Sequence, residues 1–339
     1  MLYLISTERI MRILIVNTGI IPVQLYGGTE RVIWGLGKEL IYLGHEVSFL
    51  VKKGSHCDFA SVIHIDESKP ILDQITNDYD VIHFNFKPKN IDSFKLPYII
   101  TMHGNSNTLE EFDKNTVFVS KNQANRYNCN SYVYNGLNWN EYKLPDLNTK
   151  RNYFHFLGKA AWRVKNVVGA IDVIKETKTE RLKVLGGVRF NFKMGIRFTF
   201  SPKVSFVGMV GGKIKYNLLN GSKGLIFPVR WHEPFGLAII ESLYYGCPVF
   251  GTPYGSLPEL VTEDIGYLSN KKDELKEAVL NSNSYLPKLC HEYAREKFSS
   301  RKMAIEYLKK YEKVINNEYL NISHPKLHNI QETKFLQWS

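Results

Sequence analysis

The sequence is poor in cysteine: its 339 residues include only four, and they lie far apart. Cys57, Cys129, Cys247 and Cys290 have neither the spacing of a metal site nor that of a redox motif. This usage predicts a reduced, cytoplasmic compartment and no bound metal.

The sequence also lacks a long apolar run. No stretch approaches the ~20 residues that are needed to span a bilayer. Residues 1–10 (MLYLISTERI) are too short and too charged for a secretory signal. Met11 and Arg12, followed by ILIV, resemble a natural start, so the first ten residues are expected to come from an upstream start codon or to be a short extension.

Acidic residues are few relative to basic ones in the second half of the chain. Residues 1–150 hold 15 Lys and Arg against 16 Asp and Glu, whereas residues 151–339 hold 29 against 17. This excess accounts for the net charge of +11. A phosphorylated small molecule, an anionic membrane surface, nucleic acid or an ordinary lysine-rich surface would each explain it.

Short apolar runs alternate with helical segments, the pattern of an α/β fold with parallel sheets. Strands are expected at 13–17 (ILIVN), 46–51, 79–85, 97–104, 116–120 and 131–136 (SYVYNG), then, after a linker at 135–150, at 153–158, 182–187, 204–208, 224–229 and 248–253. With 44% hydrophobic residues, the length predicts two Rossmann-like domains facing a cleft. We assign residues 1–145 and 146–300 to them, 301–320 to a helix returning to the first domain, and 321–339 to a polar tail that is compatible with disorder.

Ligands of such sheets bind beyond the carboxyl ends of the strands, so the cleft is the expected site. The most informative segment there is EPFGLAIIE, at residues 233–241. Pro234 and Gly236 end a strand, and a helix is expected from Leu237 to Gly246. The free N–H groups near Phe235, Gly236 and Leu237 would bind an anion. Glu233 would then reach sugar hydroxyls, and Glu241 a ribose diol.

Glu-x7-Glu within EPFGLAIIESLYYGCPV resembles the signature of family-four glycosyltransferases, retaining enzymes of the GT-B fold. The resemblance extends over nearly the whole chain. It implies that Gly27 and Gly28 of YGGTERV approach the donor diphosphate, and that His103 of TMHG contacts the transferred sugar. YNGLNWNEY resembles the family's interdomain linker.

Two segments depart from the family pattern. The family has Gly-Arg followed five or six residues later by Lys, and both cations bind the diphosphate. Here Gly158 is followed by Lys159, and Lys165 comes later, with Arg163 between them. Lysine neutralises phosphate without the two-pronged geometry of arginine. Residues 254–256 (YGS) replace a Gly-Gly pair before Pro-Glu, so that loop is expected to differ.

The resemblance implies transfer of a hexose or related sugar from a nucleoside diphosphate to an acceptor hydroxyl with retained anomeric configuration. The donor is a co-substrate, with a UDP-sugar favoured over a GDP-sugar, and no cofactor or metal is expected. The expected acceptor is a glycan or glycolipid of lipopolysaccharide or other cell-surface assembly, reached from the cytoplasm, with peripheral contact at the inner membrane.

Other readings stay open. A sugar-nucleotide epimerase or a glucan phosphorylase would share the fold, although a phosphorylase usually has a longer chain. A basic nucleic-acid-binding protein would leave EPFGLAIIE unexplained and shows no recognition motif, so no nucleic-acid partner is expected. Residues 188–203 (VRFNFKMGIRFTFSPK) interleave cations with phenylalanines and hold no acid. Their period-two pattern predicts an edge strand or hairpin, which would also suit lipid headgroups.

Overall fold

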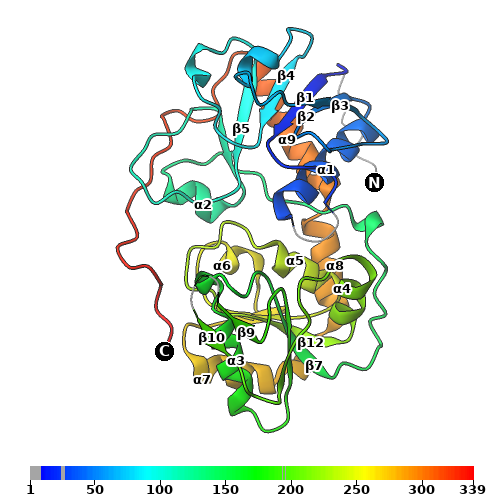
Figure 1. Ribbon diagram of the computed structural model, residues 1–339, viewed down its shortest axis with the longest axis vertical. Coiled ribbons are helices and arrows are strands. Elements are labelled where there is room, and N and C mark those ends of the chain that lie inside the picture. The colour runs from blue at the N-terminus through cyan, green and yellow to red at the C-terminus, as the bar shows by residue number, and fades with distance from the viewer. Residues whose placement is uncertain (1–8, 24–26, 193, 195) are drawn as a thin grey trace.

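The computed structural model describes residues 9–23, 27–192, 194 and 196–339. Residues 1–8 of the expected extension at 1–10, the tyrosine of YGGTERV and two positions of the 188–203 segment lie outside the described residues. The chain forms two layered α/β units, one above the other in Figure 1. Each contains a six-stranded sheet whose strands all pair in parallel.

The first sheet has the order β3-β2-β1-β4-β5-β6. Its strands are β1 (Arg12–Asn17), β2 (Glu46–Val51), β3 (Ser61–His64), β4 (Val81–Phe84), β5 (Tyr98–Met102) and β6 (Thr116–Phe118). β1 and β4 are apolar and buried almost throughout because helices and loops cover both faces of the sheet. This strand order is that of dinucleotide-binding folds, in which ligands bind where the order reverses.

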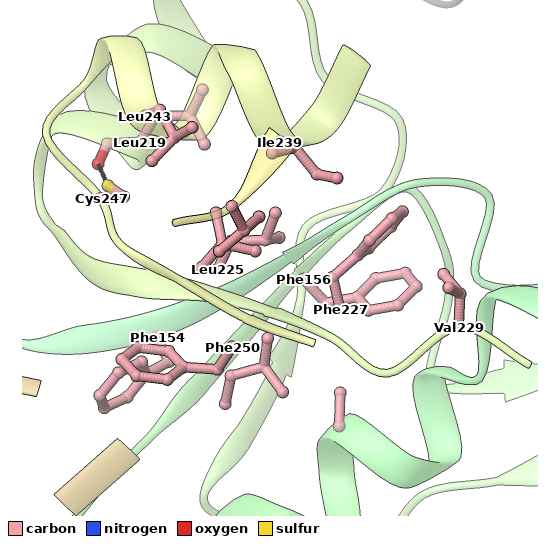
Figure 2. Close-up of a cluster of buried hydrophobic side chains, with 14 of the residues drawn as sticks. Phe154, Phe156, Leu219, Leu225, Phe227, Val229, Ile239, Leu243, Cys247 and Phe250 are labelled. Carbon is pink, nitrogen blue, oxygen red and sulfur yellow. Dashed lines mark hydrogen bonds between the residues drawn. The ribbon is translucent and has the colours of Figure 1, made fainter. Parts of the chain in front are cut away.

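The second sheet repeats this topology in the order β11-β8-β7-β12-β13-β14. Its strands are β7 (Tyr153–Leu157), β8 (Leu182–Leu185), β11 (Val204–Phe206), β12 (Ser222–Phe227), β13 (Val249–Gly251) and β14 (Gly266–Leu268). Figure 2 shows its core, where Phe154 and Phe250 pack on one face, and Leu219 and Leu243 on the other. Cys247 joins that second group, and its thiol contacts the carbonyl oxygen of Leu219 at 3.2 Å.

Helices connect the strands and cover the sheets. They are α1 (Gly28–Tyr42), α2 (Lys121–Arg126), α3 (Val167–Glu176), α4 (Gly212–Asn220), α5 (Leu237–Tyr244), α6 (Leu257–Leu260), α7 (Lys272–Leu280), α8 (Pro287–Lys297) and α9 (Ser300–Ile315). Short 3₁₀ turns occur at η1 (Leu72–Gln74), η2 (Ile91–Ser93), η3 (Trp139–Glu141), η4 (Arg163–Lys165) and η5 (Ser282–Ser284). The segment at 188–203 forms the predicted hairpin, with β9 (Phe190–Asn191) antiparallel to β10 (Arg197–Phe198).

The expected return of the last helix is confirmed. α8 lies in the second unit, and α9 continues into the first, as the stacked orange helices of Figure 1 show. α9 packs against α1, β4 and β5, and its buried Met303, Tyr307, Leu308 and Tyr311 join the core around Ile13. The domain boundaries assigned from the sequence stay predictions.

The expectation of a strand at 131–136 is wrong. Tyr132 forms only an isolated bridge to Phe118 of β6, and the chain then turns toward the second unit. Gly136 lies in this stretch, and its α-carbon passes so close to the Ser299 carbonyl that a β-carbon would lie 2.2 Å from its oxygen. Leu137 then accepts a hydrogen bond from the Ser300 N–H. This hydrogen bond joins the two segments in which the chain passes between the units, one near Leu137 and one near Ser299.

The tail at 321–339 is ordered in the structure, contrary to what its polar composition suggested. It runs along one side of the molecule from the first unit to the second (Figure 1). The carbonyl of Pro325 accepts a hydrogen bond from the Phe112 N–H at 2.8 Å, and the Leu336 N–H donates to the backbone carbonyl of Arg230 at 2.9 Å. Half-buried Trp338 packs on the core of the second unit.

Candidate active site

A cavity of about 510 Å³ lies between the two units, where the strand order of each sheet reverses. Gly27 follows β1 and His103 follows β5, while Leu157 and Phe227 end β7 and β12. All four line the cavity. The predicted convergence of these four strand ends on one pocket is therefore confirmed.

Two helices begin at this cavity. Gly28 and Thr29 open α1, while Gly236, Leu237 and Ala238 lie at the start of α5, and all five line the cavity. A β-carbon on Gly28 would lie 3.1 Å from Leu237 Cδ1, which shows how closely the two helix starts approach. Free N–H groups and the positive ends of two helix dipoles therefore face one space, an arrangement suited to an anion.

Gly236 can be only glycine without strain. Its φ is +91°, and an added β-carbon would lie 2.8 Å from Ile239 Cδ1. Pro234 and Phe235 also line the cavity. Phe235 is 2% exposed, and its ring packs 5.8 Å from the ring of Phe298. Its side chain therefore contributes to the core behind the cavity.

Glu233 is buried, and its carboxylate is held by two donors. Lys165 Nζ lies 2.5 Å from Glu233 Oε2, and Trp231 Nε1 donates to the same oxygen at 2.8 Å. The Lys165 ammonium also lies 4.9 Å from the centre of the Trp231 ring. Lys165 and Glu233 line the cavity, so the structure brings these two predicted residues together as an ion pair.

The loop at 254–256, where the sequence departs from the family pattern, positions the backbone of Glu233. Gly255 has φ +64°, and a β-carbon on it would lie 2.2 Å from the Glu233 nitrogen. The N–H of Ser256 donates to the Glu233 carbonyl at 2.9 Å, and its hydroxyl donates to the Phe235 carbonyl at 2.6 Å. Gly255 alone therefore allows this loop to approach the backbone of Glu233 closely, where the family pattern has two glycines.

Glu241 is also buried, but its partners come from both units. Its Oε1 accepts from Arg31 Nη1 of α1 at 2.5 Å, from Lys215 Nζ of α4 at 2.5 Å and from Tyr142 Oη at 2.8 Å. Burial by itself would raise the pKa of Glu241, but Arg31 and Lys215 outweigh it and hold that pKa at about 2. Glu241 lines the cavity, and among the described residues none bonds to its Oε2.

Sequence reasoning missed Arg31, Tyr142 and Lys215. Arg31 lies one turn into the helix that follows Gly27 and Gly28, so its position in the sequence could have indicated that it faces the cleft. Lys215 and Tyr142 had none, because they meet Glu241 only through the packing of α4 and the linker on α5.

His103 has a defined tautomer. The amide nitrogen of Asn85 donates to the Val16 carbonyl at 3.2 Å, so Asn85 Oδ1 faces His103 Nε2 at 2.9 Å and accepts its proton. Burial lowers the pKa of His103 to about 4. The ring is therefore neutral at pH 7, with Nδ1 as a hydrogen-bond acceptor, and His103 is one of the residues that line the cavity.

The other two predicted cations lie apart from this group. The Lys159 side chain is exposed, and Arg163 stacks 5.0 Å from the ring of Phe335 in the tail. Neither is among the described residues that line the cavity, although Gly158 and Trp162 beside them are. Over the described part of the chain, no group of His, Cys, Asp or Glu side chains is arranged to hold a metal ion.

Comparison with known proteins agrees with this geometry. The chain has the GT-B fold: it superposes on the crystal structure of AviGT4, a glycosyltransferase involved in avilamycin A biosynthesis, with a TM-score of 0.70 at 20% identity, covering 90% of this chain and 98% of that one. Anabaena HepE in complex with UDP-glucose gives a TM-score of 0.63 at 14% identity, with 89% and 99% covered.

Sequence comparison gives a match over part of the chain. Residues 139–297 match the family described as glycosyl transferases group 1. A probable sucrose-phosphate synthase of Thermosipho melanesiensis is 36% identical over 102 residues, which are 29% of this chain and 24% of that protein. The chain thus spans about a quarter of the length of the curated relatives it matches.

Proposed function

We propose that the protein is a retaining glycosyltransferase that moves a sugar from a nucleoside diphosphate to an acceptor hydroxyl. The observation that carries the proposal is the convergence of two helix starts and the Lys165–Glu233 ion pair on one interdomain cavity. The match of residues 139–297 to glycosyl transferases group 1 supports it.

The polar groups of the cavity match the parts of such a donor. The amides at the starts of α1 and α5 would bind the diphosphate, with Gly27, Gly28 and Gly236 leaving room for it. Lys165 would add a positive charge between the diphosphate and Glu233. Glu241 would accept from the ribose hydroxyls through Oε2, because its Oε1 is already occupied.

The transferred sugar would lie between Glu233 and His103. Both donors to Glu233 bond to its Oε2, which leaves Oε1 to accept from a sugar hydroxyl. Neutral His103 would accept a second hydroxyl at Nδ1. These contacts orient the ring, and neither residue acts as a nucleophile in this proposal.

In the reaction, the bond between the anomeric carbon and the β-phosphate oxygen breaks, and the acceptor oxygen forms the new bond on the same face. Negative charge develops on the departing diphosphate, where Lys165 and the helix amides stabilise it. The acceptor's proton passes to the departing phosphate oxygen. This route needs no metal ion, because fixed donors carry the charge.

Lys159 and Arg163 keep a proposed supporting role. They flank the cavity-lining Gly158 and Trp162 and would add positive potential near the diphosphate without the close contact that we assign to Lys165. For Arg163 to contact the diphosphate directly, its guanidinium would have to leave the ring of Phe335.

We favour a UDP-sugar over a GDP-sugar as donor, supported by the fold shared with HepE, whose complex holds UDP-glucose. The acceptor that we propose is a glycan or glycolipid of lipopolysaccharide or other cell-surface assembly, glycosylated in the cytoplasm at the inner membrane face. The excess of cations after residue 150 supports contact with an anionic membrane. No helix in the described part of the chain is long and apolar enough to cross a bilayer.

The test is a panel of UDP-, GDP- and ADP-sugars screened by thermal shift, since a bound donor raises the melting temperature by mass action. Glu233→Gln should lower the turnover of the stabilising donor roughly 10²-fold. Exposed Glu263 provides the matched control, and Glu263→Gln should leave turnover unchanged. Normal turnover by Glu233→Gln, or an inverted anomeric configuration in the product, would refute the proposal.

A further inference from the structure

The hairpin formed by β9 and β10 has its apolar side chains on the outside. Alternate residues along both strands are large, hydrophobic and 47% to 79% exposed: Val188, Phe190, Phe192, Ile196, Phe198 and Phe200. Phe190 and Phe198 are directly opposed in the pairing, so these side chains share one face of the hairpin. We call this set the hairpin face.

The opposite side of the hairpin is polar and faces the protein. Asn191 and Thr199 are 8% and 6% exposed. The Arg189 guanidinium donates to the carbonyls of Thr199 at 2.8 Å and Val204 at 2.6 Å. Arg197 donates to Thr199 Oγ1 at 2.9 Å and stacks 4.8 Å from the ring of Phe206. These contacts fix the orientation, so the hairpin face cannot rotate into the core.

The exposed area is large for a protein surface. An aromatic side chain presents on the order of 200 Å², so the exposed fractions of the six side chains leave roughly 600 Å² of apolar surface in one place. That is at the upper end of the largest patch on an ordinary monomer, and such patches mark interaction sites. The ring of Phe192 lies 5.5 Å from that of Phe198, and the ring of Phe190 lies 5.8 Å from those of Phe198 and Phe200. These four rings therefore form one continuous group.

The charges near the hairpin face favour an anionic lipid surface as its partner. No acidic residue occurs between positions 188 and 203, whereas Arg189, Arg197 and Lys203 are cations. Phenylalanines interleaved with cations suit the boundary between headgroups and acyl chains. A second copy of the chain would instead bring two such positive segments together, which electrostatic repulsion opposes.

The hairpin is joined at both ends to segments that line the cavity. It connects β8, which ends at the cavity-lining Leu185, to β11, which is followed by the cavity-lining Met209 and Val210. A surface that bound the hairpin would therefore bind a segment whose two flanks contribute to the cavity wall.

We propose that the hairpin face inserts into the headgroup region of an anionic bilayer and attaches the second unit to it. This proposal rests on the membrane contact proposed above and identifies the hairpin face as the surface that makes it. It can be tested without any sugar transfer, so its failure would leave the proposed reaction untouched.

The test is co-sedimentation of the full chain with vesicles of phosphatidylcholine containing 30% phosphatidylglycerol, beside vesicles of phosphatidylcholine alone. The wild type should bind the anionic vesicles, and Phe192→Glu with Phe200→Glu should weaken binding at least tenfold. These side chains are 70% and 79% exposed, so their exchange leaves the core intact. Leu144→Glu with Ile322→Glu adds the same charge at sites 74% and 100% exposed and should bind like the wild type.

A second measurement separates insertion from adsorption. In Phe200→Trp the indole should show a blue-shifted emission on addition of anionic vesicles, beyond that of the wild type. Equal binding by the wild type and the Phe192/Phe200 variant would overturn the proposal, as would a wild type that stays in the supernatant. A dimer in light scattering that the same variant converts to a monomer, without vesicle binding, would identify a second copy as the partner and also overturn it.

Discussion

Replacement of Glu241 tests the charge cluster that joins the two units. Glu241→Gln keeps the shape of the side chain but leaves Lys215, whose side chain is 6% exposed, and half-buried Arg31 without a counter-ion. Breaking a buried pair in this way typically costs about 3–5 kcal/mol. We expect the free energy of unfolding in urea at pH 7 to fall by that amount, whereas Glu263→Gln should leave it unchanged.

The pH dependence gives an independent measure of the same cluster. The pKa of Glu241 falls from 4.5 to about 2 on folding, a shift that corresponds to about 3 kcal/mol. Because the folded pKa is the lower one, this stabilisation is complete above pH 4.5 and is lost as the pH falls toward 2. By pH 3.5 the wild type should have lost about 1 kcal/mol more than Glu241→Gln.

The assay is urea unfolding of both proteins at pH 7, 5 and 3.5. Lys215→Met should cost less than Glu241→Gln at pH 7, because Arg31 and Tyr142 still satisfy the carboxylate and an apolar chain replaces the buried ammonium. Parallel pH profiles for the wild type and Glu241→Gln would refute the assignment of the low pKa to this cluster.

Three further predictions concern the cavity and the tail. Gly236→Ala should lower the unfolding free energy by about 1–2 kcal/mol and weaken donor binding in calorimetry, because it strains a residue at φ +91° and crowds Ile239. The pH profile of kcat/KM should show no step near 6.5 from His103, whose pKa is about 4; a step there that is absent in His103→Asn would contradict this. Trp338→Ala should lower the unfolding free energy by about 1–2 kcal/mol and speed proteolysis of the tail, whereas unchanged proteolysis would show that this side chain does not hold it.

Most of the fold was predictable because local rules determine it. Buried parallel strands require continuous apolar runs, and these were visible at ILIVN and at most of the other strands. The error at 131–136 has a non-local cause. Tyr132 and its neighbours have strand-forming composition, but after the single bridge of Tyr132 the chain leaves the sheet, and Gly136 packs against the backbone of Ser299.

The tail and the hairpin show a second limit. Polar composition suggested disorder after residue 320, yet backbone hydrogen bonds to both units and the packing of Trp338 hold that segment. The period-two pattern at 188–203 predicted a hairpin, and the structure has one. The sequence did not indicate which face of the hairpin points outward. That orientation depends on the hydrogen bonds from Arg189 to the carbonyls of Thr199 and Val204, which form only in the tertiary structure.

By itself the sequence determined the two parallel sheets, the cleft at their strand ends and the helix start at Gly236, because strand burial and a glycine-proline break are local properties. Tertiary structure alone decided the partners of the two glutamates. Glu233 meets Lys165, 68 positions away, and Glu241 meets Arg31, 210 positions away. The first contact depends on how the loops after β7 and β12 meet within the second unit, and the second on how the two units pack together. No local pattern in the chain encodes either placement.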